Sequence, residues 1–187
     1  MDDSEQELHH VAPDETVEGR EDVLEELADA VVLGLRDYCQ KSGIERIVLG
    51  LSGGIDSAVA ACVAAEAMGA ENVLGISMPS RFSSQHSIDD AQHTAQALGL
   101  EYACISIDEH HAGLEKELAS MLEHGADVAQ ENIQARLRGI LVMAHANAQG
   151  RMAIATGNKS ELAQGYCTLY GDMAGGYAPL GDLYKME

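Results

Sequence analysis

The strongest chemical signal in the sequence is the segment LGLSGGIDSAV at positions 49–59. An apolar run leads there into Ser52 and two glycines, and then into Asp56 and a small-residue pattern typical of a helix. Glycines let backbone N–H groups approach a ligand closely, and a helix begins with a partial positive charge. Together with the hydroxyl of Ser57, these features predict a site for an anion the size of pyrophosphate. A tight turn without a ligand is the alternative.

The carboxylate distinguishes this loop from the phosphate-binding loop of many ATPases, in which a lysine reaches the β- and γ-phosphates. By itself, Asp56 would repel a polyphosphate. It suits a loop that holds Mg²⁺ against the phosphates, because Mg²⁺ binds one or two carboxylates together with phosphate oxygens. The loop therefore indicates transfer of AMP and argues against transfer of the γ-phosphate.

The string SGGIDS resembles the pyrophosphate loop of the N-type ATP pyrophosphatases. Members of that superfamily cleave ATP between the α- and β-phosphates and adenylate a substrate. By itself the string identifies the superfamily and not the member. The resemblance implies that ATP is a cosubstrate and that one continuous run of residues contacts it: Gly50, Leu51, Ser52, Gly53, Gly54, Ile55, Asp56 and Ser57.

Three further stretches narrow the resemblance to the NAD synthetase family, and specifically to the synthetase domain of its glutamine-dependent type. They are MPSRFSS (78–84), ENIQARLRG (131–139) and the long stretch from ATGNKSE to Lys185 (155–185). The resemblance implies an enzyme that amidates deamido-NAD to NAD through an adenylated intermediate and releases AMP and pyrophosphate. Ammonia, free or from a glutaminase, would supply the nitrogen.

The resemblance also assigns residues outside the loop. It implies that Asn132 contacts deamido-NAD, with Arg136 nearby. Both lie one turn apart on one face of a predicted helix. From the residues alone, a solvated polar face is the alternative, since charged helix faces usually mean only that. The resemblance further implies that Thr156 and Lys185 contact ATP.

A second carboxylate is placed by the same resemblance at the reacting centre. Glu161 would lie near deamido-NAD and the metal, so that Asp56 and Glu161 could share Mg²⁺. The alternative for Glu161 is an acid in the first turn of a helix, which is a common position for an acid. Two other functions stay open at this stage: another adenylating enzyme of the superfamily, and a nucleotide-binding module without turnover.

Strand and helix patterns alternate along the chain, and this order predicts an α/β fold. We expect a doubly wound, mostly parallel sheet with helices on both faces, of the Rossmann-like adenine-nucleotide α-hydrolase type. Ligands of such sheets bind beyond the carboxyl ends of the strands. The predicted strands are 44–51, 72–78, 102–107 and 151–156, and the predicted helices are 21–40, 55–69, 87–98, 112–123 and 126–148.

Two apolar stripes are expected to bury the helices that carry the motifs. One lies on the helix after the loop and the other on helix 126–148, where the core is the expected partner and a dimer interface is the alternative. The resemblance implies a homodimer. The residues of the first stripe are Ile55, Ala58, Val59, Cys62 and Val63, and those of the second are Val128, Ile133, Leu137, Ile140, Leu141 and Ala144.

Residues 1–20 are polar and acidic and predict a flexible segment before a domain at 21–187. The family's synthetase domain continues past the position of Glu187, so the resemblance implies a chain that lacks the C-terminal portion. A fragment, a split-gene product and a reduced homologue all remain open, and a separate glutaminase is a possible partner. Residues 170–177, YGDMAGGY, predict a mobile loop.

Composition excludes several classes of partner. The formal net charge of −20 argues against binding to nucleic acid or to an anionic membrane surface, which needs lysine and arginine. The longest apolar stretches are too short to span a bilayer. The four cysteines are scattered without a Cys-x-x-Cys pair, so neither a zinc site nor a disulfide frame is indicated, and Cys62 and Cys104 are expected in the core. A cytoplasmic enzyme is predicted.

Overall fold

The structure, a computed structural model, describes residues 17–122 and 127–186. Most of the predicted flexible segment lies outside these residues. In chain order the elements are α1 (Val17–Ser42), β1 (Ile47–Gly50), α2 (Ile55–Met68), the short 3₁₀ turn η1 (Ala70–Asn72), β2 (Val73–Ser77), α3 (Gln85–Leu98), β3 (Glu101–Cys104), α4 (Asp108–Glu117), α5 (Ala119–Leu122), α6 (Asp127–Gln149), β4 (Met152–Ala153) and α7 (Lys159–Gln164).

The four strands form one parallel sheet in the order β3-β2-β1-β4. β1 lies at the centre, with Ile47 opposite Val73 of β2 and opposite Met152 of β4. The carboxyl ends of all four strands therefore lie along one edge. The chain reverses its order of strand addition at β1, because β2 and β3 extend the sheet on one side and β4 on the other. Such a switch point is where open α/β sheets bind ligands.

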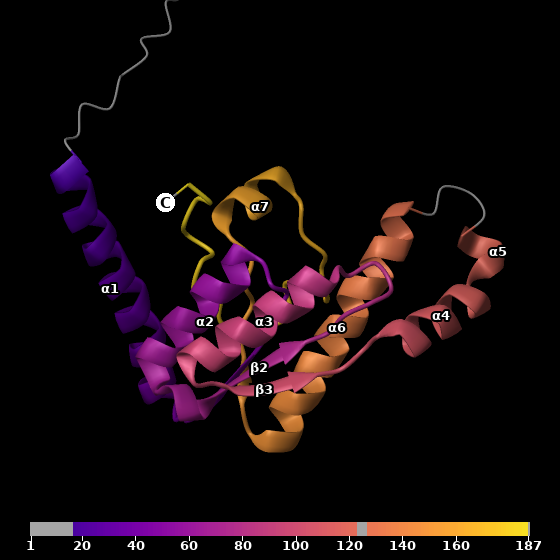
Figure 1. Cartoon of the computed structure of the whole chain (residues 1–187), viewed down its shortest axis with the longest axis horizontal. Helices are drawn as coiled ribbons and strands as arrows, with labels where there is room; N and C mark the ends of the chain where they lie inside the picture. The colour runs from indigo at the N-terminus through magenta and orange to yellow at the C-terminus, as the bar shows by residue number, and fades with distance from the viewer. Residues whose placement is uncertain (1–16, 123–126, 187) are drawn as a thin grey trace, which may run out of the picture.

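Alternate residues of β1 face two separate cores. Ile47 and Leu49 pack with α1, α2 and α3, whereas Val48 packs with Leu74 and with the α6 residue Val142. Figure 1 shows α2 and α3 above β2 and β3, and α6 passing behind the two strands. The predicted doubly wound, parallel α/β fold is thus confirmed, with helices on both faces.

The first helix starts earlier than predicted and ends where predicted. α1 begins at Val17, inside the segment that we expected to be flexible, and the acidic residues after it suit the positive start of a helix. It ends at Ser42 because Gly43 adopts a left-handed φ of 67°. The amide of Ile44 then donates to the carbonyl of Cys39, which closes the helix.

The apolar stripe predicted for α2 is wrong for Ile55, Val59 and Cys62, whereas Val63 is buried as predicted. Ile55 is 65% exposed and Val59 is 39% exposed, and Cys62 is also exposed. The buried face is made instead of small residues with Ser57 and Val63: Ala60, Ala61, Ala64 and Ala67. Small side chains let a helix lie close to the sheet and to α1, so the buried face of α2 does not carry its bulkiest residues.

Helix α6 shows the same deviation. Val142 and Ala146 are buried against the sheet, while Ile140 is 63% and Val128 is 68% exposed. Leu141 is only partly buried at the edge of this core. The stripe predicted for α6 is therefore rotated toward solvent by part of a turn, and Ile140 is free of the core.

The end of the sheet also differs from the prediction. β4 pairs with β1 over only Met152 and Ala153, because the chain then turns to a new partner. The amide of Ala155 donates to the carbonyl of Tyr177, and that of Gly176 donates to the carbonyl of Ala153. The second half of the glycine-rich segment is thus hydrogen-bonded along this edge. The mobility predicted for the segment stays a prediction.

Several surface features complete the fold. Predicted helix 112–123 is replaced by α4 and α5, and Cys104 is exposed on β3, contrary to expectation.

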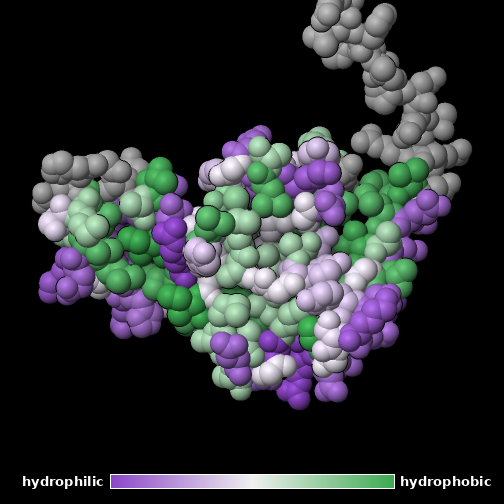
Figure 2. All heavy atoms as spheres, turned by 180° about the vertical axis from the view of Figure 1, so that it is seen from behind, coloured by the Kyte–Doolittle hydropathy of each residue, from purple (hydrophilic) through white to green (hydrophobic). Residues whose placement is uncertain are grey.

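Figure 2 shows apolar side chains along α1, where Val23 is 54% exposed, and around the end formed by α4, α5 and α6, where Met121 is 75% exposed. None of the described helices is long and apolar enough to cross a membrane.

Candidate functional site

A pocket of about 510 Å³ lies at the carboxyl edge of the sheet, at the switch point. The loops after β1, β2 and β4 line this pocket together with residues of α6. Its lining residues that matter below are Gly50, Leu51, Ser52, Gly54, Asp56, Ser57, Pro79, Ser83, Arg138, Gly139, Thr156, Glu161, Cys167 and Asp172. The structure thus brings together the loop after β1 and the ATGNKSE stretch, as predicted.

The loop at residues 50–57, the phosphate loop, is held in shape by its own hydroxyls. Ser57 is 3% exposed, and its Oγ donates to the carbonyl of Gly54 and accepts from the amide of Ser52. The Oγ of Ser52 in turn accepts from the amide of Gly54. The two serines that we expected to bind a ligand therefore also pre-form the loop, which lowers the entropy lost when an anion binds.

Gly53 is required by the loop's conformation rather than by contact with the pocket. Its φ is 80°, and a Cβ at this position would lie 2.2 Å from the carbonyl oxygen of Ser87 on α3. The glycine thus lets the loop pass directly over the first turn of α3. Gly53 and Ile55 do not line the pocket, and the side chain of Ile55 points into solvent.

Asp56 lies at the start of α2 and forms an ion pair with Lys185, which lies 129 positions later in the sequence. Its Oδ2 accepts a hydrogen bond of 2.7 Å from the Nζ of Lys185, and the amide of Lys185 donates to the Oγ of Ser160. The predicted ATP contact Lys185 thus lies beside the predicted metal ligand. The hydrogen bond to Asp56 raises the pKa of Lys185 above its ordinary value, and the nearby charge of Glu161 contributes.

This pair predicts the titration of one lysine. Since folding raises the pKa of Lys185, its contribution to stability is fully present below the ordinary lysine pKa of 10.5 and is lost as the pH rises through the raised value. NMR titration of the Lys185 side chain should give a midpoint above 10.5, and Asp56→Asn should lower that midpoint toward the ordinary value. A wild-type midpoint at or below 10.5 would contradict the pair.

Glu161 has a structural role as part of the N-terminal cap of α7. It is the third residue of α7, where its Oε2 accepts from the amide of Asn158 while its own amide donates to the Oδ1 of Asn158. This capping box fixes the carboxylate at the pocket wall, near Thr156. The alternative reading of Glu161 as a first-turn helix acid is therefore correct as far as it goes, and it does not exclude a second role in the pocket.

The carboxylates of Asp56 and Glu161 suit Mg²⁺ in type and number. One oxygen of each is engaged, by Lys185 and by Asn158, and no hydrogen bond within the described part of the chain engages the other oxygen of either group. Magnesium binds one or two carboxylates and completes its shell with water and phosphate oxygens. Among the described residues, no cluster of three or more metal-binding side chains occurs, so a metal here would depend on the substrate's oxygens.

Asn132 and Arg136 lie outside this pocket. The Oδ1 of Asn132 accepts from the hydroxyl of Thr168 at 2.7 Å, and the Nε of Arg136 donates to the carbonyl of Leu169 at 3.3 Å. Both side chains line a second hollow of about 470 Å³ between α5 and α6. In this structure they hold the segment after α7 against α6, so a contact with deamido-NAD stays a prediction.

Arg138, from the motif stretch at 131–139, is the cation inside the pocket, although it was not among the residues predicted to bind ATP or deamido-NAD. Its Nε donates to the carbonyl of Met78, and burial lowers the pKa of its guanidinium. No carboxylate in the described ranges forms an ion pair with it. Arg138 lies one turn before Val142, on the face of α6 that packs on the sheet. That spacing was the available signal, but the expected stripe was placed on another face.

Comparison with known proteins identifies the family. The sequence pattern of the family described as NAD synthase matches residues 27–187. The chain belongs to the NAD synthase family. A glutamine-dependent NAD(+) synthetase from Rhodobacter capsulatus is 57% identical over 157 residues, which are 83% of this chain and 28% of that protein. The NAD synthase match thus includes the phosphate loop and every other predicted site residue.

Solved structures of NAD synthetases share this fold. A glutamine-dependent NAD+ synthetase from Acinetobacter baumannii in complex with ADP has a TM-score of 0.84 and 43% identity, over 87% of this chain and 31% of that one. An NH3-dependent NAD synthetase from Campylobacter jejuni has a TM-score of 0.79 and 34% identity, over 87% of this chain and 69% of that one. The chain spans less than a third of the length of the Rhodobacter capsulatus and Acinetobacter baumannii proteins.

Proposed function

We propose that this chain binds ATP in the pocket at the carboxyl edge of the sheet and converts deamido-NAD to NAD. One observation carries the proposal: in a chain of the NAD synthase family, the phosphate loop and the ATGNKSE stretch, far apart in sequence, line one pocket. The carboxylate of deamido-NAD attacks the α-phosphorus of ATP and releases pyrophosphate. Ammonia then attacks the acyl adenylate, AMP leaves with the bonding electron pair, and the nitrogen loses a proton.

The pocket supplies positioning and charge, and the reaction needs no side-chain nucleophile. Backbone N–H groups of the phosphate loop and the start of α2 suit the β- and γ-phosphates, which depart as pyrophosphate. Arg138 adds a positive charge that no carboxylate of the described residues neutralises. Cys167 also lines the pocket, but the proposed reaction gives its thiol no task.

Asp56 and Glu161 are the residues that would hold Mg²⁺ in this pocket. When bound, the ion would neutralise negative charge on the departing pyrophosphate. In the structure, the ammonium group of Lys185 pairs with Asp56 and so places a positive charge beside the carboxylate that would bind the ion. We infer that Lys185 exchanges Asp56 for a phosphate oxygen when ATP and metal bind, consistent with the ATP contact predicted for it.

The nitrogen source, assembly and location belong to the same proposal. The family resemblance favours ammonia, either free or from a glutaminase, and a relative in Campylobacter jejuni is NH3-dependent. We propose a homodimer that covers Ile140 and Met143, which are 63% and 38% exposed on α6. A monomer mass of 19.9 kDa in light scattering would contradict the dimer. A cytoplasmic location is likewise proposed.

A pyrophosphate-release assay tests the function. Purified protein with ATP, Mg²⁺ and ammonium should release pyrophosphate and form NAD when deamido-NAD is present, and should release little with nicotinate or with small carboxylic acids. Release with another acid and none with deamido-NAD would indicate a different adenylating enzyme. Binding of ATP without release under any of these conditions would indicate a nucleotide-binding module.

A further inference from the structure

The loop at residues 79–84, which follows β2, forms one wall of the pocket. Pro79, at its start, and Ser83, near its end, both line the pocket. Between them the chain makes a tight turn, in which the amide of Ser83 donates to the carbonyl of Ser80 and the amide of Ser80 donates to the Oγ of Ser83. The position of this turn therefore sets where the wall of the pocket lies.

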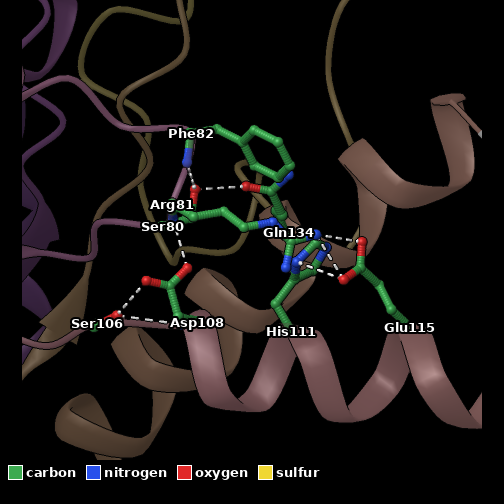
Figure 3. A network of polar contacts seen from close by, with 8 residues as sticks. All are labelled: Ser80, Arg81, Phe82, Ser106, Asp108, His111, Glu115 and Gln134. Atoms are coloured by element: carbon green, nitrogen blue, oxygen red, sulfur yellow. Dashed lines mark hydrogen bonds and ion pairs between the residues drawn. The ribbon is translucent and has the colours of Figure 1, made fainter.

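Helix α4 presents a polar face to this turn. Asp108, His111 and Glu115 are spaced i, i+3 and i+7, so they share one side of the helix, and Figure 3 shows all three directed at the 79–84 loop. His111 is fully buried, although neither ring nitrogen has a hydrogen-bond partner in the described residues. This side of α4 therefore meets the 79–84 loop largely through polar side chains.

Two side chains of α4 bind Arg81. Its amide donates to the Oδ1 of Asp108 at 2.5 Å, and its guanidinium donates to both oxygens of Glu115 at 2.8 Å and 2.7 Å. Asp108 is itself fixed by the hydroxyl of Ser106, which donates to its Oδ2. Two anchors on one residue, seven positions apart along a rigid helix, fix both the place and the orientation of the turn.

Contacts from neighbouring side chains also hold the 79–84 loop in place. The Oγ of Ser80 donates to Gln134 of α6, and the ring of Phe82 stands edge-on to His111 at 6.4 Å between centroids. The hydrogen bond from Arg81 also lowers the pKa of Glu115, which keeps the carboxylate charged and able to hold the guanidinium. Neither Glu115 nor Arg81 lines the pocket. The hydrogen bonds of Glu115 go to Arg81, and its Oε2 lies 3.7 Å from the Nδ1 of His111, so an effect of Glu115 on the substrate would act through the 79–84 loop.

We propose that Arg81 and Glu115 are a positioning pair: Glu115 holds Arg81, and through it the 79–84 loop, in the place that lets the pocket accept its nucleotide. This inference rests on the proposed function for the identity of the nucleotide. It assigns to α4 a role in substrate affinity that neither residue could have by touching the substrate from its place in this structure.

A double-mutant cycle tests the pair. Glu115→Gln and Arg81→Gln should each raise the KM for ATP about tenfold with little change in kcat, because displacing a positioning element weakens binding before it affects the chemistry. The double variant should also lie near tenfold, since Glu115 acts through Arg81. Effects that multiply to about a hundredfold, or an unchanged KM in either single variant, would overturn the proposal.

Two controls keep the result readable. Glu101→Gln breaks another glutamate–arginine pair, with Arg151 at the amino end of the sheet, and should leave the KM unchanged. If Glu115→Gln does not fold, Arg81→Lys keeps the charge but shortens the side chain and removes the planar guanidinium, whose Nη2 donates to both oxygens of Glu115. It should still raise the KM several-fold. An unchanged KM in a folded Arg81→Lys protein would then count against the pair.

The same cycle can be read without turnover. The dissociation constant for ATP with Mg²⁺, measured by calorimetry on the full chain, should follow the KM pattern. A wild type that binds ATP but forms no NAD overturns the proposed function alone. If the wild type and the three variants of the cycle all bind ATP with the same dissociation constant, the positioning pair alone is overturned.

Discussion

Replacing Asp56 with asparagine should lower pyrophosphate release from ATP and deamido-NAD by at least about 100-fold, the loss typical when one group that stabilises transition-state charge is removed. The amide keeps the size of the side chain but cannot neutralise Lys185 or offer a charged oxygen to Mg²⁺. Release of pyrophosphate at saturating ATP, measured across a range of Mg²⁺ concentrations, checks the prediction. Excess Mg²⁺ should restore only part of the loss.

A matched control is available on α1. Asp37 pairs with Lys41 at 2.6 Å, much as Asp56 pairs with Lys185 at 2.7 Å, but the pair is exposed and does not line the pocket. Asp37→Asn should leave pyrophosphate release unchanged. Equal losses in the two variants would show that the effect came from the overall charge of this acidic chain, and normal release in Asp56→Asn would remove Asp56 from the mechanism.

Features encoded by neighbouring residues could be predicted from the sequence. The strands of the sheet, their parallel direction and the stop at Gly43 all follow from local patterns: apolar runs, alternation with helices, and a glycine where φ is positive. The phosphate loop was also recognisable, because its hydroxyls and glycines bond within a span of a few residues. The confirmed family and fold depended on such local motifs.

Features that depend on packing between distant segments could not be predicted. The buried faces of α2 and α6 consist largely of alanine and glycine, and a search for large apolar residues selected Ile55 and Ile140, which are exposed. Close helix–sheet contact favours small side chains, so hydrophobic size is a poor guide to the buried side in this fold. Arg138 lies on the buried face of α6, so its place inside the pocket was not predicted either.

The ion pairs in and around the site could not be predicted from the sequence either. The pair of Lys185 with Asp56 joins residues 129 positions apart, and the hold of α4 on Arg81 spans 34 positions to Glu115. The sequence placed Lys185 and Asp56 at one site only through the family resemblance. Asn132 and Arg136 show the opposite outcome, since the structure engages both with the segment after α7 and outside the pocket.

The second large effect is expected from Gly53→Ala. A left-handed φ costs an alanine about 1–2 kcal/mol. The added Cβ would also lie 2.2 Å from the carbonyl oxygen of Ser87, so the backbone of the loop or of α3 must move. We expect a loss of about 2–5 kcal/mol in the free energy of unfolding, from strain and overpacking together. Because the displaced backbone is the phosphate loop, ATP binding should be lost as well.

Gly43→Ala separates the two causes. Gly43 also has a positive φ, of 67°, but nothing lies within 4 Å of the Cβ position. It should therefore show only the cost of the conformation, about 1–2 kcal/mol in chemical denaturation, and bind ATP normally. If both variants lose the same stability and both bind ATP, the close approach of the loop to Ser87 does not constrain the site. A larger loss confined to Gly53→Ala, accompanied by weak ATP binding, would show that the path of the phosphate loop over α3 sets the shape of the anion site.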